Sequence, residues 1–299
     1  PWRIREEGIY TLEKGKTYYT SNSGLMDLRI EISRYLERRF GLNYDAEKEI
    51  IVTVGGSEGI DLAFRAMLNP GDEVIIPEPC YVSYVPCVTL ADGVPVTVNL
   101  KEENDFKLTK EQLLSAITPR TKILVLAFPN NPTGAVMTKE ELEEIAEVVK
   151  EKDIFVVSDE IYAELSYGNT RHCSIASIDG MKERTIVING FSKAHAMTGW
   201  RLGYACGPEV IIKQMLKIHQ FAIMCAPTNS QYANIAEFGL TSDEFATRFL
   251  TEEKVAVVPG TAFGDCGEGF LRMSYASSLS NLKTAMERLE KFIDRLRNK

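Results

Sequence analysis

The sequence is poor in the patterns that metal sites, disulfide frameworks and membrane spans require. It holds only three histidines, and none of its six cysteines stands in a C-x-x-C pair. This argues against a zinc cage, so we expect no bound metal. A chain of 299 residues needs no disulfides to form a core, so we expect reduced cysteines and a cytoplasmic location. No apolar run reaches the length of a membrane span, and we expect no membrane contact.

Charge of one sign is not concentrated anywhere in the sequence. The formal net charge is −8, without a basic patch or a block of like charges, so nothing indicates nucleic-acid binding. The first residues, Pro1-Trp2-Arg3, resemble neither a signal peptide nor a natural start. The composition, 44% hydrophobic and 25% charged, is that of an ordinary globular protein. The length allows one large domain, or one large and one small.

The middle of the chain alternates short β-rich segments with helical patterns. Several segments, such as ILVLAF and IFVVS, are nearly continuous apolar runs, which are typical of strands covered on both faces. Helical stripes occur between them, for example in Ser57–Leu68 and Thr138–Lys150. This alternation predicts an α/β domain with a seven-stranded, mostly parallel sheet and helices on both faces. The predicted strands are Glu49–Val54, Glu73–Pro77, Val94–Asn99, Lys122–Phe128, Ile154–Ser158, Thr185–Asn189 and Leu202–Cys206.

The end of the chain follows a different pattern, which predicts a smaller α+β domain. We therefore expect a large domain over residues 1–233 and a small one over residues 234–299. The elements predicted after the large domain are a helix at Thr241–Leu250, strands at Val255–Val258 and Phe270–Tyr275, and an amphipathic helix at Asn281–Arg297.

Polar segments follow four of the predicted strands directly. They are Gly55–Gly59, Pro129–Gly134, Asp159–Tyr162 and Gly190–Lys193. If these strands are parallel, the four segments meet at one edge of the sheet, where α/β proteins bind ligands. A Gly-Gly-Ser turn that enters a helix suits a phosphate group, although it can also be an ordinary tight turn. Each segment alone has such a plain explanation, and only the ordered combination points to a site.

Four segments, KTYYTSNSG, NNPTG, SDEIY and SKAHAMTGWRLGY, resemble those of the fold-type I, class I and II aminotransferases. Their order and approximate separations are similar too, and the resemblance runs from Pro1 to Lys299. It is nearest to bacterial aspartate-aminotransferase-like enzymes and N-acetyl-diaminopimelate aminotransferases. The resemblance implies a pyridoxal 5'-phosphate enzyme that moves an amino group between an amino acid and a 2-oxo acid. It also makes glutamate and 2-oxoglutarate our expected pair for one half-reaction.

The resemblance assigns the reacting end of the cofactor to a few side chains. Lys193 matches the lysine that forms the Schiff base and shuttles the substrate proton. Asp159 matches the acid at the pyridine nitrogen, which keeps that nitrogen protonated. Tyr162 and Asn131 match the pair that hydrogen-bonds the phenolic oxygen, and Asn131 also borders the substrate. Tyr81 matches the aromatic residue that stacks on the ring.

The resemblance also assigns the phosphate, the substrate carboxylate and a partner subunit. Residues at the phosphate correspond to Arg201, Ser192 and the backbone at Gly56, Ser57 and Glu58. Where some relatives have SxSK, this chain has Gly190-Phe191-Ser192-Lys193, which removes one hydroxyl. Arg272 matches the arginine that binds the α-carboxylate, although without the resemblance it could be an ordinary exposed strand residue. Tyr19 matches the tyrosine that reaches the neighbouring subunit, which implies a homodimer.

Two pieces that the resemblance leads us to expect are absent from the sequence. One is a segment before Pro1, and the other is an interdomain helix between Ala233 and Asn234, where SQYA runs directly into NIAEFG. Two other functions stay open on the same residues. A carbon–sulfur β-lyase would use the same lysine, acid and arginine. A transcription-factor sensor domain of this fold would need a DNA-binding extension, of which we find no sign.

Overall fold

The structure is a computed structural model, and it describes residues 2–166, 171–233, 258–259, 271–272, 283–289 and 291–292. The chain divides into two compact units, which we describe separately. One comprises residues 1–166 and 172–237, and the other residues 167–171 and 238–299. The predicted helix at Thr241–Leu250 and the seam after Ala233 lie outside the described residues. The predicted domain boundary therefore stays a prediction.

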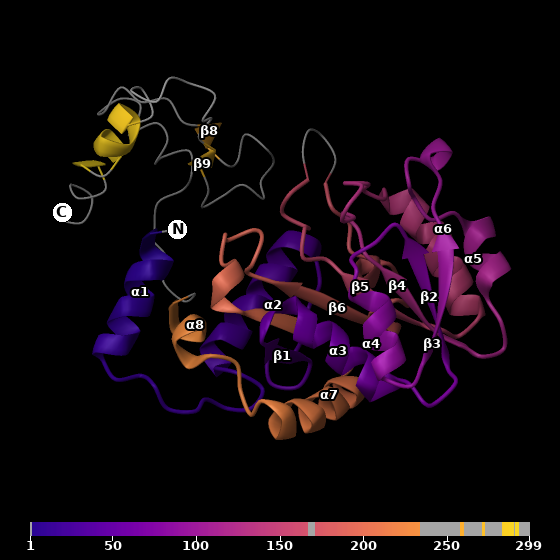
Figure 1. The fold of residues 1–299 in the computed structure, drawn as a ribbon, viewed down its shortest axis with the longest axis horizontal. Helices are drawn as coiled ribbons and strands as arrows, with labels where there is room; N and C mark the ends of the chain where they lie inside the picture. Colours follow the sequence, from indigo (N-terminus) through magenta and orange to yellow (C-terminus); the bar gives the residue numbers. More distant parts are fainter. Residues whose placement is uncertain are drawn as a thin grey trace. The chain divides into compact units, whose positions relative to one another are not determined.

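A seven-stranded sheet forms the centre of the first unit, in the order β1-β7-β6-β5-β4-β2-β3 (Figure 1). All seven predicted strands are confirmed, and their ends differ from the predicted ones by two residues at most. Such differences are expected because strand ends are set by pairing with neighbours. The strands are β1 (Ile50–Thr53), β2 (Glu73–Glu78), β3 (Val94–Asn99), β4 (Thr121–Leu126), β5 (Phe155–Asp159), β6 (Thr185–Gly190) and β7 (Gly203–Cys206).

The direction of β7 decides what meets at each edge of this sheet. Strands β2 to β6 pair in parallel, whereas β7 runs antiparallel to both β1 and β6. Six strands therefore end at one edge, which we call the carboxyl edge, and β7 begins there. The connection from β6 to β7 does not cross the sheet, so both of its ends lie at the carboxyl edge.

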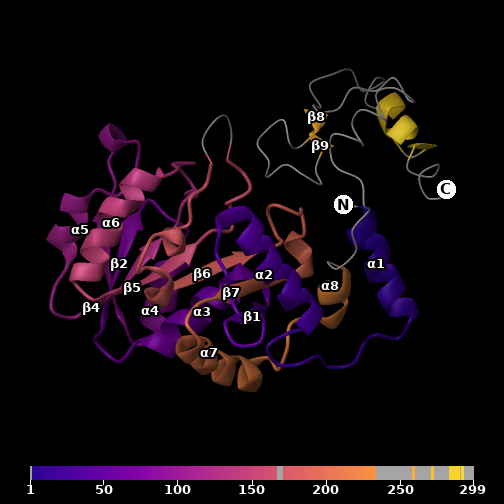
Figure 2. The ribbon, with the colours of Figure 1, turned by 180° about the vertical axis from the view of Figure 1, so that it is seen from behind.

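Helices cover both faces of the sheet (Figures 1 and 2). Helices α3, α4 and α7 pack on one face in a common apolar cluster. Helices α5 and α6 pack on the other face, where α2 covers the end of the sheet near β1 and β7. The helices are α1 (Trp2–Glu13), α2 (Met26–Phe40), α3 (Gly55–Met67), α4 (Tyr84–Leu90), α5 (Lys110–Ala116), α6 (Lys139–Glu151), α7 (Glu209–Ala222) and α8 (Thr228–Ala233). Single 3₁₀ turns occur at Glu102–Asn104, Ile175–Ser177, Lys182–Arg184 and Thr198–Trp200.

Helix α6 begins with a side-chain cap, whereas α3 begins without one. The Thr138 hydroxyl accepts the Glu141 N–H, and the Glu141 carboxylate accepts the Thr138 N–H, which completes a capping box. Helix α3 has Val54 at the same position and no side-chain cap. The first N–H groups of a helix have no partner within it. At the start of α3 they are left for another acceptor.

The start of α3 lies directly against β7 because glycines meet there. A Cβ atom on Gly203 would lie 2.5 Å from the Gly55 carbonyl carbon and 2.6 Å from the Gly56 nitrogen. A Cβ on Gly190, opposite it in β6, would lie 2.8 Å from the Gly203 Cα. Glycine is therefore required for this close approach. The contact brings the first turn of α3 to the carboxyl edge.

The second unit is described at only a few positions. Strands β8 (Val258–Pro259) and β9 (Leu271–Arg272) pair antiparallel. β9 lies within the predicted strand Phe270–Tyr275, whereas β8 shares only Val258 with the predicted strand Val255–Val258. Residues 283–289 and 291–292 are helical, inside the predicted C-terminal helix. Across the described parts of both units, we find no helix with the length and apolarity of a membrane span.

Candidate active site

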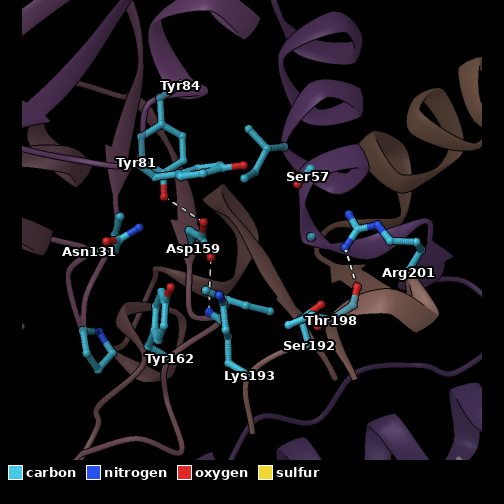
Figure 3. A pocket seen from close by; sticks show the side chains of 15 residues that line it. Ser57, Tyr81, Tyr84, Asn131, Asp159, Tyr162, Ser192, Lys193, Thr198 and Arg201 are labelled. Atoms are coloured by element: carbon cyan, nitrogen blue, oxygen red, sulfur yellow. Dashed lines mark hydrogen bonds between the residues drawn. The ribbon is translucent and has the colours of Figure 1, made fainter. Parts of the chain in front are cut away.

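A cavity of about 290 Å³ opens at the carboxyl edge of the sheet (Figure 3). Its walls come from the segments that follow β1, β2, β4, β5 and β6 and from the segment that precedes β7. The lining residues are Gly56, Ser57, Ile60, Tyr81, Tyr84, Ala127, Pro129, Asn131, Asp159, Ile161, Tyr162, Ser192, Lys193, Thr198 and Arg201. The convergence expected from parallel strands is thus present, and the antiparallel β7 adds Arg201 to it.

Most residues singled out from the sequence line this cavity, whereas the side chains of Glu58 and Tyr19 do not. Those that line it are Gly56, Ser57, Tyr81, Asn131, Asp159, Tyr162, Ser192, Lys193 and Arg201. The Glu58 side chain turns away, toward His219. Tyr19 is 76% exposed and is not among the lining residues. Arg272 has a described backbone in β9, but its side chain lies outside the described part of the chain.

Asp159 forms the buried acid of the cavity. It stands two residues after Val157 on β5, so both side chains point to the face that α4 covers. The Tyr84 hydroxyl donates to Oδ2 at 2.7 Å, and the Ile161 N–H donates to Oδ1 at 3.1 Å. Burial raises the pKa of the Asp159 carboxyl, and these two hydrogen bonds oppose that rise. The carboxylate is therefore fixed in orientation and shielded from water.

Tyr84 is a site residue that the sequence does not reveal. It begins α4, three residues after Tyr81, and the two rings meet edge to face with centroids 5.7 Å apart. Burial raises the pKa of the Tyr84 hydroxyl well above its usual value, so the group stays a donor to Asp159. Its only sequence signal is the repeated tyrosine in PCYVSY.

Glu160 directly follows β5 and is not among the residues that line the cavity. Its carboxylate is fully buried and accepts hydrogen bonds from the hydroxyls of Ser158 at 2.9 Å and Ser174 at 2.6 Å. The His172 Nε2 lies 2.9 Å from its other oxygen. These contacts hold His172 and Ser174 against the end of β5.

Lys193 supplies the primary amine at the cavity. It follows β6 directly after the buried Ser192, and its Nζ lies 5.4 Å from the centre of the Tyr162 ring. Figure 3 shows Lys193, Tyr162 and Asp159 around the same space. An exposed primary amine beside a buried acid can serve as a nucleophile and as a proton carrier.

Arg201 and the start of α3 form a cationic, donor-rich end of the same cavity. The Arg201 backbone is left-handed, with φ of 51°, and its Nη1 donates to the Thr198 carbonyl at 3.0 Å. A Cβ on Gly55 would lie 2.6 Å from the Arg201 Nη2, so glycine makes room for the guanidinium. Gly56 and Ser57, in the first turn of the uncapped helix α3, line the same cavity. Such an arrangement favours an anion.

The whole chain is similar to enzymes of one class. Residues 3–239 match the family described as aminotransferase class I and II. A putative aminotransferase of Bacillus subtilis, YugH, is 46% identical over an alignment that covers 98% of this chain and 88% of that protein. An aspartate aminotransferase of Pyrococcus abyssi is 40% identical over the same shares of the two chains. The crystal structure of an aromatic aminotransferase from Pyrococcus horikoshii shares 39% identity and a TM-score of 0.78, and it covers 99% of this chain and 93% of that one.

Proposed function

Because this chain belongs to the family of class I and II aminotransferases, we propose that it binds pyridoxal phosphate in the cavity at the carboxyl edge. The protein is a pyridoxal-phosphate-dependent aminotransferase, which moves an amino group between an amino acid and a 2-oxo acid. One observation carries the location of its site. The Lys193 amine, the buried Asp159 carboxylate and the start of α3 at Ser57, which suits an anion, all line one cavity.

The cavity fits the three chemical features of this cofactor. An aldehyde needs an amine, which Lys193 provides, and a pyridine nitrogen needs an acid, which Asp159 provides. A phosphate needs donors and a cation, which the start of α3 and Arg201 provide. The volume of about 290 Å³ is close to the lower end of the roughly 300–1,000 Å³ range of ligand pockets.

The side chains of this site would divide the work of the reaction. When bound, the cofactor supplies a conjugated ring that accepts electrons from the substrate's Cα. We propose that Lys193 attaches to the cofactor and, once released, carries the proton at that Cα. Asp159 would hold a proton on the pyridine nitrogen, and Tyr84 and Ile161 keep its carboxylate aimed.

The remaining cavity residues would orient the ring and the phosphate. We propose that Tyr81 stacks on the ring, and that Asn131 and Tyr162 donate to its phenolic oxygen. All three line the cavity, and Asn131 lies at its exposed rim, where a substrate can also reach it. The proposed phosphate contacts are Arg201, Ser192 and the backbone of Gly56 and Ser57. Glu58 contributes no lining atom, and its role is considered below.

We propose glutamate and 2-oxoglutarate as one substrate pair, with Arg272 on the α-carboxylate. An arginine binds a carboxylate through two parallel hydrogen bonds, which also fixes the orientation of the Cα–H bond. The purified enzyme, loaded with pyridoxal phosphate and given glutamate without a 2-oxo acid, should release about one 2-oxoglutarate per site and then stop. Continuous release of pyruvate and ammonia from cysteine or cystathionine, with no 2-oxo acid added, would indicate a carbon–sulfur β-lyase and contradict the proposal.

We further propose a homodimer in which Tyr19 completes the partner's site. Tyr19 is 76% exposed and does not line its own cavity. Large apolar side chains are exposed in the same unit, among them Phe221 at 87%, as expected of a surface that another subunit covers.

Mixed dimers test this arrangement directly. Lys193→Ala and Tyr19→Ala subunits, each weakly active alone, should recover roughly a quarter of wild-type activity after mixing. The reason is that half of the dimers are hybrids, and each hybrid has one site with both residues intact. Analytical ultracentrifugation should first show a dimer of each variant. Mixtures that stay as inactive as their components would rule out a shared site.

A further inference from the structure

Glu58 and His219 join the start of α3 to α7 beneath the cavity. The Glu58 Oε2 accepts the backbone N–H of Val54 at 2.5 Å. The Glu58 Oε1 lies 2.7 Å from the Nδ1 of His219, near the end of α7. The carboxylate thus bridges the residue that precedes α3 and a second helix on the same face of the sheet.

Both side chains are withdrawn from water. The His219 side chain is fully buried, and the Glu58 side chain is 10% exposed. An ionised carboxylate only accepts hydrogen bonds, so the geometry assigns a proton to Nδ1. The His219 Nε2 has no hydrogen-bond partner among the described residues. The contact to Glu58 is therefore the hydrogen bond that fixes this ring, and a buried polar ring without it would be costly.

This bridge explains how α3 begins firmly without a side-chain cap. In α6, the capping threonine uses its hydroxyl to occupy a free N–H of the first turn. In α3, the Val54 side chain offers no hydrogen-bond acceptor. The Glu58 carboxylate, which does not line the cavity, instead accepts the backbone N–H of Val54. The first turn is held in place while its N–H groups stay open to the cavity at Gly56 and Ser57.

We propose that Glu58 and His219 are positioning residues for the phosphate end of the cavity. The proposal rests on the proposed function, in which the start of α3 binds the cofactor's phosphate. His219 holds the Glu58 carboxylate, Glu58 holds the Val54 N–H, and the first turn of α3 keeps the orientation that a phosphate requires. Neither residue touches the phosphate, so both act only through the backbone of α3.

The test compares ligands with and without a phosphate in cofactor-free full-length protein. His219→Leu removes the Nδ1 donor, whereas His219→Asn keeps an N–H donor near the same place. Loss of the bridge should weaken binding of pyridoxal phosphate and of inorganic phosphate about tenfold. Binding of pyridoxal, which has no phosphate, should stay within about twofold, and His219→Asn should restore most of the phosphate affinity. Isothermal calorimetry measures all three ligands.

Met215→Ala is the matched control, because Met215 is a buried residue one turn earlier on α7 without a place in the bridge. It should lower the melting temperature but leave the preference for phosphate unchanged. Equal weakening of pyridoxal and pyridoxal phosphate in His219→Leu would overturn the inference, as would unchanged affinities. If His219→Leu does not fold, Glu58→Ala gives the same comparison. A wild-type protein that binds both ligands equally well would instead contradict the proposed phosphate site itself.

Discussion

Replacing Lys193 with alanine is expected to lower kcat by at least about 10³-fold while the protein still binds pyridoxal phosphate. The amine is proposed both as the attachment point and as the proton carrier, and general acid–base catalysis alone contributes about 10²–10⁴-fold. Cofactor binding should survive because Arg201 and the start of α3 lie at the other end of the cavity. Stopped-flow kinetics gives kcat, and equilibrium dialysis gives the amount of bound cofactor.

The absorbance spectrum separates the two roles of the lysine. In the wild type, the band of the lysine-linked cofactor should move with pH, and in Lys193→Ala that band should be replaced by the spectrum of unlinked cofactor. Lys193→Arg is the matched control, because it keeps the positive charge but is not deprotonated in proteins. It should be as inactive as Lys193→Ala, and a small primary amine added to Lys193→Ala should restore part of the rate. Turnover within about threefold of wild type in either variant would refute the assignment.

Replacing Asp159 with asparagine should cost about 10²-fold or more in kcat with little loss of folded protein. Asparagine has nearly the same shape and can still accept the Ile161 N–H, but it cannot hold a proton on the pyridine nitrogen by charge. Asp153→Asn, a change at a carboxylate that is 90% exposed, is the control and should leave turnover unchanged. Equal turnover in Asp159→Asn and wild type would remove the acid from the mechanism.

The same substitution should make the cofactor-free protein more stable at neutral pH. Burial raises the pKa of Asp159 in the folded state, above an unfolded value of about 3.9. Folding then takes up a proton between these two pKa values, so the stability contributed by this group falls as pH rises through that window. Urea unfolding should show Asp159→Asn to be the more stable protein at pH 7, and the difference should shrink below pH 4. If Asp159→Asn is instead less stable than wild type at pH 7, favourable interactions of the ionised carboxylate outweigh the cost of burying its charge, which contradicts the prediction.

The sequence predicts the parts of the site that depend on strand ends. Asn131, Asp159 and Lys193 each follow an apolar run, and parallel strands bring such segments together. Their convergence therefore needs no knowledge of side-chain packing. The direction of β7 is a different matter. Its pattern matches a strand in either direction, so the presence of Arg201 at the same edge could be inferred only from the family resemblance.

The features that the sequence does not predict depend on contacts between distant segments. Tyr84 bonds to Asp159 across 75 positions of the chain, and Glu58 meets His219 across 161 positions. Local pattern gives no partner for an isolated histidine or a second tyrosine, because the partner is chosen by how helices pack on the sheet. For the same reason the sequence does not reveal that the Glu58 side chain turns toward His219 on α7.

Because β7 is antiparallel, the loop between β6 and β7 lies at the carboxyl edge with the cavity, and it should tolerate insertions less well than the loops at the opposite edge. Lys193 and Arg201 occupy one uninterrupted stretch between β6 and β7, so any added residue there alters the distance between amine and guanidinium. The turns that lead into β3, β4 and β5 lie at the opposite edge of the sheet, remote from the cavity lining. Affinity tags, fluorescent labels or new chain ends are therefore best introduced at those turns, where a change of length leaves the reacting groups in register.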